Sequence, residues 1–117
     1  MQYSDSLVLR QKIHDMILYL YRVMAHAPKY EKFTSQTQAK NLAFEFEKTV
    51  LRANKSTSKK SHLYEADIQL EQLREIIDIM HELEFIKSPQ QYKHLAEMLD
   101  EIGRLLGGLI KFAQQQK

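Results

Sequence analysis

Apolar residues recur at steps of three and four along most of the 117-residue chain, which is the spacing of one buried face of an α-helix. This pattern predicts four amphipathic helices, over residues 5–26, 35–55 and 61–85 and from residue 88 onward. The apolar stripes that define them are Ile13, Met16, Ile17, Leu20, Tyr21 and Met24; Ala39, Leu42, Ala43, Phe46, Val50 and Ala53; Leu63, Ala66, Leu70, Leu73, Ile77 and Met80; and Tyr92, Leu95, Leu99, Ile102, Leu106 and Leu109.

Local signals mark the helix boundaries. Pro28 disfavours helical backbone at the residue before it and so ends the first helix. Ser35 followed by Gln38 fits a capping box, and Ser88-Pro89-Gln90-Gln91 places a capping serine before a proline in the first helical position and a glutamine in the third. Residues 54–61, rich in lysine and serine, are expected to form the central loop.

The predicted fold class is all-α. Only three glycines and two prolines punctuate the chain, far fewer turn signals than a protein built of strands requires. The third and fourth stripes follow heptad spacing, which favours helices that cross at a shallow angle. Four helices with short loops form an antiparallel up-down bundle about 30–40 Å long. We expect residues 1–117 to form one such domain.

Some apolar residues fall outside the stripes. Phe44 and Phe46 are two residues apart, about 200° around a helix, so Phe44 points outward if Phe46 is buried. Ile68 and Ile79 lie on the side of the third helix opposite its stripe. Several large apolar residues outside one core indicate a second buried surface. We expect this surface to be a contact between copies of the chain.

Three glycines interrupt the last predicted helix. Each glycine inside a helix costs about 1 kcal/mol relative to alanine, so some other feature should offset Gly103, Gly107 and Gly108. Close approach of a neighbouring backbone at Gly103 and Gly107, at a subunit contact, is one explanation. The other is that the helix ends or bends near Gly107 and Gly108.

Composition excludes several classes of protein. With no cysteine, the chain has no disulfide scaffold, thiolate metal site or cysteine nucleophile. The longest uncharged apolar runs are six residues, whereas a bilayer span needs about 20. The first residues lack the basic start and apolar run of a signal peptide. A soluble, cytoplasmic protein without a membrane partner is therefore expected.

Charge is unevenly distributed behind the formal net charge of +2. Residues 29–60 contain eight basic and three acidic residues, whereas residues 61–101 contain three basic and ten acidic residues. Within the basic segment, Lys48, Arg52, Lys55 and Lys59 follow steps of four, three and four, and Lys60 extends the cluster through the loop. Such a basic stripe is typical of phosphate binding. A solvated outer face, neutralised by neighbouring acidic helices, is the alternative.

The residues give little support for catalysis. No carboxylate falls on a core stripe, so a buried di-metal site has no ligands, and Asp78-x-x-His81 and His94-x-x-Glu97 are better explained as surface pairs. We expect no metal and no cofactor. Arg74 and His81, with six residues between them, resemble the Arg-x(4–6)-His signature of the HEPN ribonucleases, although Glu75 follows the arginine where that family has a small polar residue. This spacing leaves a ribonuclease as a remote alternative.

A second resemblance covers most of residues 7–112. Three short stretches of the chain carry it: Ala53-Asn54-Lys55-Ser56, Leu63-Tyr64-Glu65-Ala66-Asp67 and Leu70-Glu71-Gln72-Leu73-Arg74. Together with Glu101-Ile102-Gly103-Arg104-Leu105-Leu106-Gly107-Gly108, they resemble the accessory variability determinant of diversity-generating retroelements. Four-helix proteins encoded in intervening sequences of 23S ribosomal RNA genes are wider relatives. Their Asn-Ile-Ala-Glu-Gly motif is missing here, which favours the retroelement branch.

The resemblance implies a non-catalytic four-helix protomer that assembles into a ring-like homopentamer. It also implies binding to a reverse transcriptase and to RNA or DNA, in support of mutagenic copying of a template RNA. We expect contacts from the basic cluster that runs from the second helix into the central loop and from two arginines further on: Lys48, Arg52, Lys55, Lys59, Lys60, Arg74 and Arg104. The expected subunit contacts are Phe44, Ile68, Ile79, Gly103 and Gly107.

Two positions and the charge of one helix depart from the family pattern. Asp78 stands where members often have a second basic residue, Leu109 stands where they often have tryptophan, and the third helix is acidic. Arg104 has the alternative role of pairing with that acidic helix. The rival function is an interaction module of the intervening-sequence type that has no polymerase partner.

Overall fold

A computed structural model describes residues 3–31 and 33–115 of the chain. Four α-helices account for most of this range, with no strand among the described residues. They are α1 (Tyr3–Ala25), α2 (Ser35–Lys55), α3 (Lys59–Glu82) and α4 (Pro89–Gln115), with a short 3₁₀ helix, η1 (Lys29–Glu31), between α1 and α2. The prediction of an all-α fold with four helices is confirmed.

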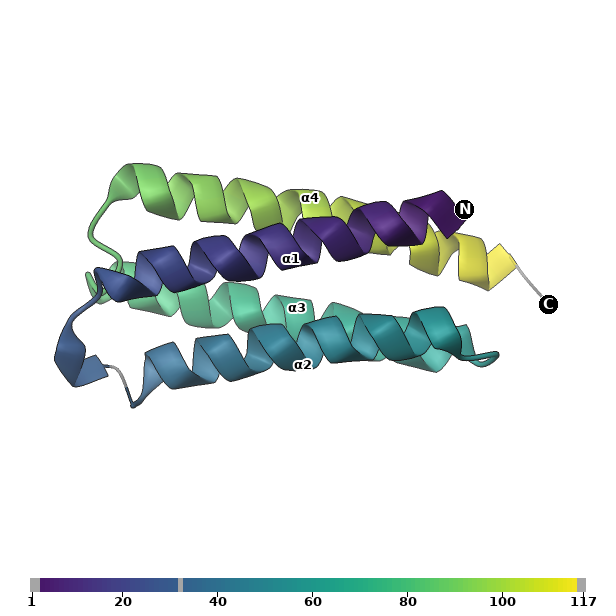
Figure 1. Cartoon of the computed structure of the whole chain (residues 1–117), viewed down its shortest axis with the longest axis horizontal. Helices are drawn as coiled ribbons and strands as arrows, with labels where there is room; N and C mark the ends of the chain where they lie inside the picture. The colour runs from purple at the N-terminus through teal and green to yellow at the C-terminus, as the bar shows by residue number, and fades with distance from the viewer. Residues whose placement is uncertain (1–2, 32, 116–117) are drawn as a thin grey trace.

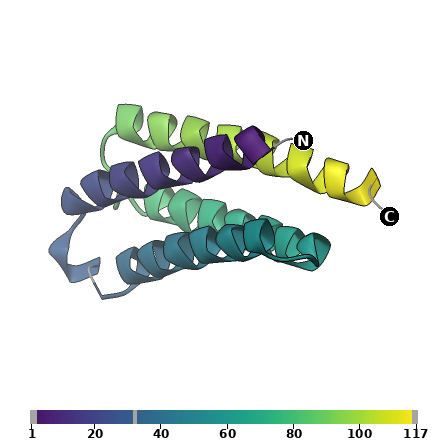
Figure 2. The ribbon, with the colours of Figure 1, turned by 45° about the vertical axis from the view of Figure 1, so that its right-hand side comes forward.

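The helices run antiparallel, and each packs against two neighbours (Figure 1). Because α2 and α4 both pack against α1 and α3, they occupy diagonal corners of the bundle. The start of α1 and the end of α4 lie at the same end of the bundle as the turn between α2 and α3 (Figure 1). The bundle measures 48 × 24 × 19 Å, longer than expected because α4 continues beyond the other helices at one end and η1 projects at the other (Figure 1 and Figure 2). None of the helices, within the described residues, has a segment long and apolar enough to cross a membrane.

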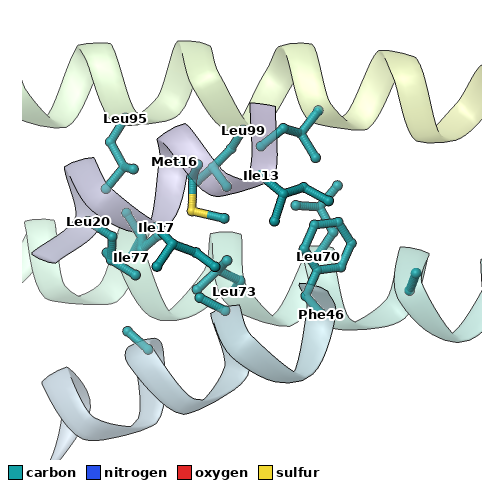
Figure 3. Close-up of a cluster of buried hydrophobic side chains, with 14 of the residues drawn as sticks. Ile13, Met16, Ile17, Leu20, Phe46, Leu70, Leu73, Ile77, Leu95 and Leu99 are labelled. Carbon is teal, nitrogen blue, oxygen red and sulfur yellow. The ribbon is translucent and has the colours of Figure 1, made fainter. Parts of the chain in front are cut away.

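The core lies along the axis of the bundle. Figure 3 shows labelled side chains from all four helices pointing into the space between them, among them Met16, Phe46, Leu73 and Leu99. Phe46 is fully buried while Phe44 is 46% exposed, which confirms the predicted division between these two residues. The burial of Phe46 makes it central to stability, since truncating a buried phenylalanine costs about 3–5 kcal/mol.

Tyr21 was predicted as part of the core stripe of the first helix, and this prediction is wrong. Its side chain is 42% exposed and packs edge-on against the ring of Phe44 on the surface. Tyr21 follows the fully buried Leu20 by one residue, and a step of about 100° carries it from the core to the boundary with α2. Leu9 and Val23, which the pattern did not include, are buried instead.

α2 spans the predicted residues 35–55, but Thr34 and not Ser35 occupies its N-cap position, which differs from the predicted capping box. The loop after α2 is shorter than predicted, because α3 begins at Lys59 and not at residue 61. The predicted start of the last helix is confirmed, because the backbone N–H of Gln91 donates to the Ser88 hydroxyl at 3.2 Å and Pro89 is the first helical residue.

α3 ends three residues before the predicted boundary, in a left-handed turn at Glu84, whose φ is 65°. The backbone N–H of Phe85 donates to the Met80 carbonyl at 2.8 Å, and that of Glu84 donates to the His81 carbonyl at 3.0 Å. These two bonds define a Schellman motif, which usually has glycine where this chain has Glu84. The buried Phe85 and Met80 supply the apolar contact that accompanies the motif.

Candidate nucleic-acid and partner interface

The basic residues of α2 lie on its outward side. Lys48, Arg52 and Lys55 are exposed, and none of them forms an ion pair with another described residue. Successive residues of an α-helix are about 100° apart, which places Lys48 and Lys55 within about 40° of the exposed Phe44 and opposite the buried Ala53. We call Lys48, Arg52 and Lys55 the basic strip. It presents three unpaired cations to the outside of the bundle.

Lys59 has a structural role. Its Nζ donates to the backbone carbonyls of Ala53 at 3.1 Å and Asn54 at 3.2 Å, in the last turn of α2. These carbonyls have no partner within the helix, and the negative end of the helix dipole attracts the ammonium group. Lys60, next along the chain, is exposed in the first turn of α3, not in a loop as predicted. Of these two lysines, Lys59 is the one whose ammonium group contacts the α2 carbonyls.

Arg74 reaches from α3 to the backbone of α4. Its Nη2 donates to the Leu99 carbonyl at 2.9 Å and lies 3.0 Å from Oδ1 of Asp100. Its Nε is buried without a hydrogen-bond partner in the described structure. The guanidinium therefore connects the two helices, and any contact with a phosphate would compete with these bonds.

Gly103 leaves room for the Arg74 side chain to reach the backbone of α4. A Cβ at this position would lie 2.9 Å from Nη2 of Arg74, closer than real Cβ contacts come. Within the chain, the group that approaches Gly103 is thus a side chain and not a neighbouring backbone as expected. A Cβ on Gly107 would meet nothing within 4 Å, and α4 continues through both residues to Gln115. The roles predicted for both glycines at subunit contacts remain predictions.

Arg104 lies in acidic surroundings. It is exposed on α4 and lines a shallow hollow together with Arg74 and the carboxylates of Asp67, Glu71 and Asp100. The basic strip is on α2, the helix diagonally opposite α4. The predicted cations therefore divide into two groups: Arg74 and Arg104 at the acidic α3–α4 surface, and the basic strip with Lys60 on the α2 side.

The two residues that resemble a ribonuclease signature have separate contacts. The His81 ring stacks on the ring of Tyr92, with centroids 3.7 Å apart and an interplanar angle of 7°. The Tyr92 hydroxyl donates to Asp78 at 2.7 Å, and this bond, helped by burial and nearby carboxylates, raises the pKa of Tyr92 above its usual value of 10.0. Arg74 is held by Leu99 and Asp100 instead. Among the described residues, no three His, Asp or Glu side chains converge as metal ligands.

Large apolar side chains lie outside the core, as the pattern predicted. Ile68 is 61% exposed and Ile79 is 52% exposed, both on α3. Ile79 also lines a hollow of about 550 Å³ between α2 and α3, beside Leu42 and Ile76. Together with Phe44, these isoleucines leave apolar surface on two sides of α2.

Aromatic residues from two helices lie near the basic strip. In the fold, Tyr21 of α1 packs against Phe44 of α2 in an edge-to-face arrangement, with ring centroids 6.2 Å apart. Nζ of Lys40 lies 4.5 Å from the centroid of the Tyr21 ring. Phe44, one turn before Lys48, and Tyr21 beside it therefore form an exposed pair of aromatic rings at one end of the basic strip. The off-stripe position of Phe44 was the signal in the sequence, but its partner comes from another helix.

Comparison with known proteins gives one result that identifies a family. No curated protein and no solved structure matches the chain. A family model described as bAvd-like matches residues 7–113, which is most of the chain. This match confirms the resemblance to the accessory variability determinants and supports an Avd-type accessory protein. The chain belongs to the bAvd-like family.

Proposed function

We propose that this protein is a non-enzymatic accessory subunit of a diversity-generating retroelement, which binds nucleic acid through the α2 side of the bundle. The observation that carries the proposal is the basic strip, Lys48, Arg52 and Lys55, which is exposed and forms no ion pair within residues 3–31 and 33–115, in a member of the bAvd-like family. Lysine and arginine side chains without protein partners attract phosphate groups, and this attraction does not depend on base sequence. Lys60 extends the same surface at the start of α3.

The partner in this proposal is the reverse transcriptase of the same retroelement. Membership of the family supports this partner. The acidic α3–α4 surface, where Arg74 and Arg104 lie, is free for a protein contact while nucleic acid occupies the α2 side. A reverse transcriptase gene and a template repeat beside this gene, and co-purification of the two proteins, would support the assignment. Their absence would favour an interaction module of the intervening-sequence type.

A charge-reversal pair tests nucleic-acid binding. In the Lys48→Glu/Arg52→Glu variant, we expect the affinity for a fluorescein-labelled RNA to fall by at least tenfold, measured by fluorescence anisotropy at low salt. The matched control is Lys93→Glu/Lys111→Glu, which changes the net charge equally on exposed positions of α4. Equal losses in the two variants would mean that only net charge matters, and the assignment to α2 would be wrong.

We also propose that the protein forms a homo-oligomer, with a pentamer as the expected assembly. Support comes from the exposed Ile68 and Ile79 of α3, which are large apolar side chains outside the core of one protomer. Light scattering at two salt concentrations should give a mass five times the 13.9 kDa of one chain. A monomer at both salt concentrations would contradict this part of the proposal.

A further inference from the structure

Phe44 is an exposed aromatic ring held in a defined position. Tyr21 contacts it edge-to-face with a centroid distance of 6.2 Å, and 46% of the Phe44 surface remains open to solvent. Lys40 places its Nζ 4.5 Å from the centroid of the Tyr21 ring. A cation this close to an aromatic ring is attracted to its face, so Lys40 and Tyr21 support each other beside Phe44.

Cations and apolar side chains alternate along this side of α2. Lys40, Phe44 and Lys48 follow each other at steps of four residues, about 6 Å apart along the helix axis. Leu51 and Lys55 continue the same outward line, and Leu51 is 37% exposed. On α2, Lys40 and Lys48 lie one turn before and one turn after the exposed Phe44 ring. An exposed aromatic ring between cations is a combination that binds single-stranded nucleic acid.

We infer that the outer face of α1 and α2 binds single-stranded RNA or DNA, with a base stacked on Phe44 and the flanking phosphates bound by Lys48, Arg52 and Lys55. Tyr21 and Lys40 are positioning residues that hold the Phe44 ring. This inference rests on the proposed function and specifies its ligand. A duplex keeps the faces of its bases covered by their neighbours, so it binds only through its phosphates. An unpaired strand exposes the base faces that stacking requires.

The absence of tryptophan in the chain allows a direct test. In Phe44→Trp, the single tryptophan should be quenched by a 20-nucleotide oligo(dT) and much less by a blunt 20-base-pair duplex, each added to saturation. The matched control is Tyr30→Trp. Tyr30 is an exposed aromatic residue of η1, packed against Phe85 at the end of the bundle, and its replacement should show no quenching with either probe. Equal quenching of Phe44→Trp by both probes would contradict base stacking.

Phe44→Leu supplies the second measurement, because it keeps an apolar side chain and removes the ring. Loss of one stacked base should weaken oligo(dT) binding by about tenfold or more and leave duplex binding unchanged. Its mass by light scattering should equal that of the wild type. A changed mass would mean that a second copy of the chain covers Phe44, and it would overturn the inference.

The stacking inference and the proposed function can fail separately. If Phe44→Leu binds oligo(dT) like the wild type while Lys48→Glu/Arg52→Glu does not, stacking is wrong and phosphate binding by α2 stands. If the wild type binds neither oligo(dT) nor the duplex, both proposals are wrong.

Discussion

Gly103 and Gly107 are four residues apart in α4, yet their surroundings differ. A Cβ at Gly103 would meet Nη2 of Arg74 at 2.9 Å, whereas a Cβ at Gly107 would meet nothing within 4 Å. A shift of the guanidinium away from this Cβ would strain its bonds to the Leu99 carbonyl and to Asp100. Gly103 therefore leaves room for a contact between helices, whereas at Gly107 no described atom comes close enough to its Cβ position to offset the cost in helix stability.

Alanine substitutions separate these two cases. Gly107→Ala should raise the free energy of unfolding by about 0.5–1 kcal/mol, because alanine favours the helix. Gly103→Ala should be less stabilising, or destabilising, since it displaces Arg74 from Leu99. Urea denaturation gives both values. In an Arg74→Ala background the two substitutions should have the same effect, and a persistent difference there would show that Arg74 is not the reason for Gly103.

At the scale of elements, Lys59 connects α2 to α3. Lys59→Gln should lower the free energy of unfolding by about 0.5–1 kcal/mol, because two carbonyls in the last turn of α2 lose their ammonium partner. Lys60→Gln removes a cation from the same first turn of α3 without these contacts, so it should not destabilise the protein. For RNA affinity we expect the reverse order, with the larger loss in Lys60→Gln. Equal stabilities by urea denaturation would contradict the capping role of Lys59.

The contact between Tyr92 and Asp78 makes the packing of α3 on α4 sensitive to alkaline pH. The pKa of Tyr92 in the folded protein is raised, chiefly by the hydrogen bond to Asp78. A raised pKa stabilises the fold below the unfolded value of about 10 and loses that contribution as pH rises through the folded value. Tyr92→Phe should therefore be less stable than the wild type at pH 8, and the difference should shrink above pH 10. Melting curves of both proteins between pH 8 and 11 measure this difference in stability. A difference that stays constant over this range would contradict the role of the Tyr92–Asp78 hydrogen bond.

The elements were predictable because each helix carries its own pattern. Burial of Phe46 with exposure of Phe44 followed from their angular separation alone. Helix boundaries that depend on contacts with another segment of the chain were not predictable in the same way. The start of α3 at Lys59 involves carbonyls at the end of α2, and the end of α3 uses a left-handed Glu84 where the sequence lacks the expected glycine. Sequence spacing reports on one helix, whereas these features join two segments.

On the scale of the whole molecule, the candidate site was predictable only in part. The stripe of Lys48, Arg52 and Lys55 could be read from periodicity, and all three are exposed on one side of α2. Spacing could not predict that Arg74 lies away from this strip, because its position depends on which helices occupy diagonal corners of the bundle. For the same reason the pairing of Tyr21 with Phe44 was missed, since the two rings come from different helices.

Charge gives the molecule two different sides. The basic strip is on α2, and the carboxylates around Arg104 lie at the α3–α4 surface. Under the proposed function, this separation lets a chain with a net charge of only +2 attract nucleic acid, because salt screening limits the interaction of each phosphate to charges within about 10 Å. The acidic residues then weaken binding less than the net charge suggests.

The most direct test of binding by α2 is the salt dependence of affinity for an unstructured RNA. Contacts from Lys48, Arg52, Lys55 and Lys60 predict a slope of log K against log salt of about −2 to −3 per protomer, because each phosphate contact on a single strand contributes about −0.7. Lys48→Glu/Arg52→Glu should reduce the magnitude of the slope by about 1.4 or more. A wild-type affinity that does not change with salt, or a slope unaltered in the double variant, would contradict the account.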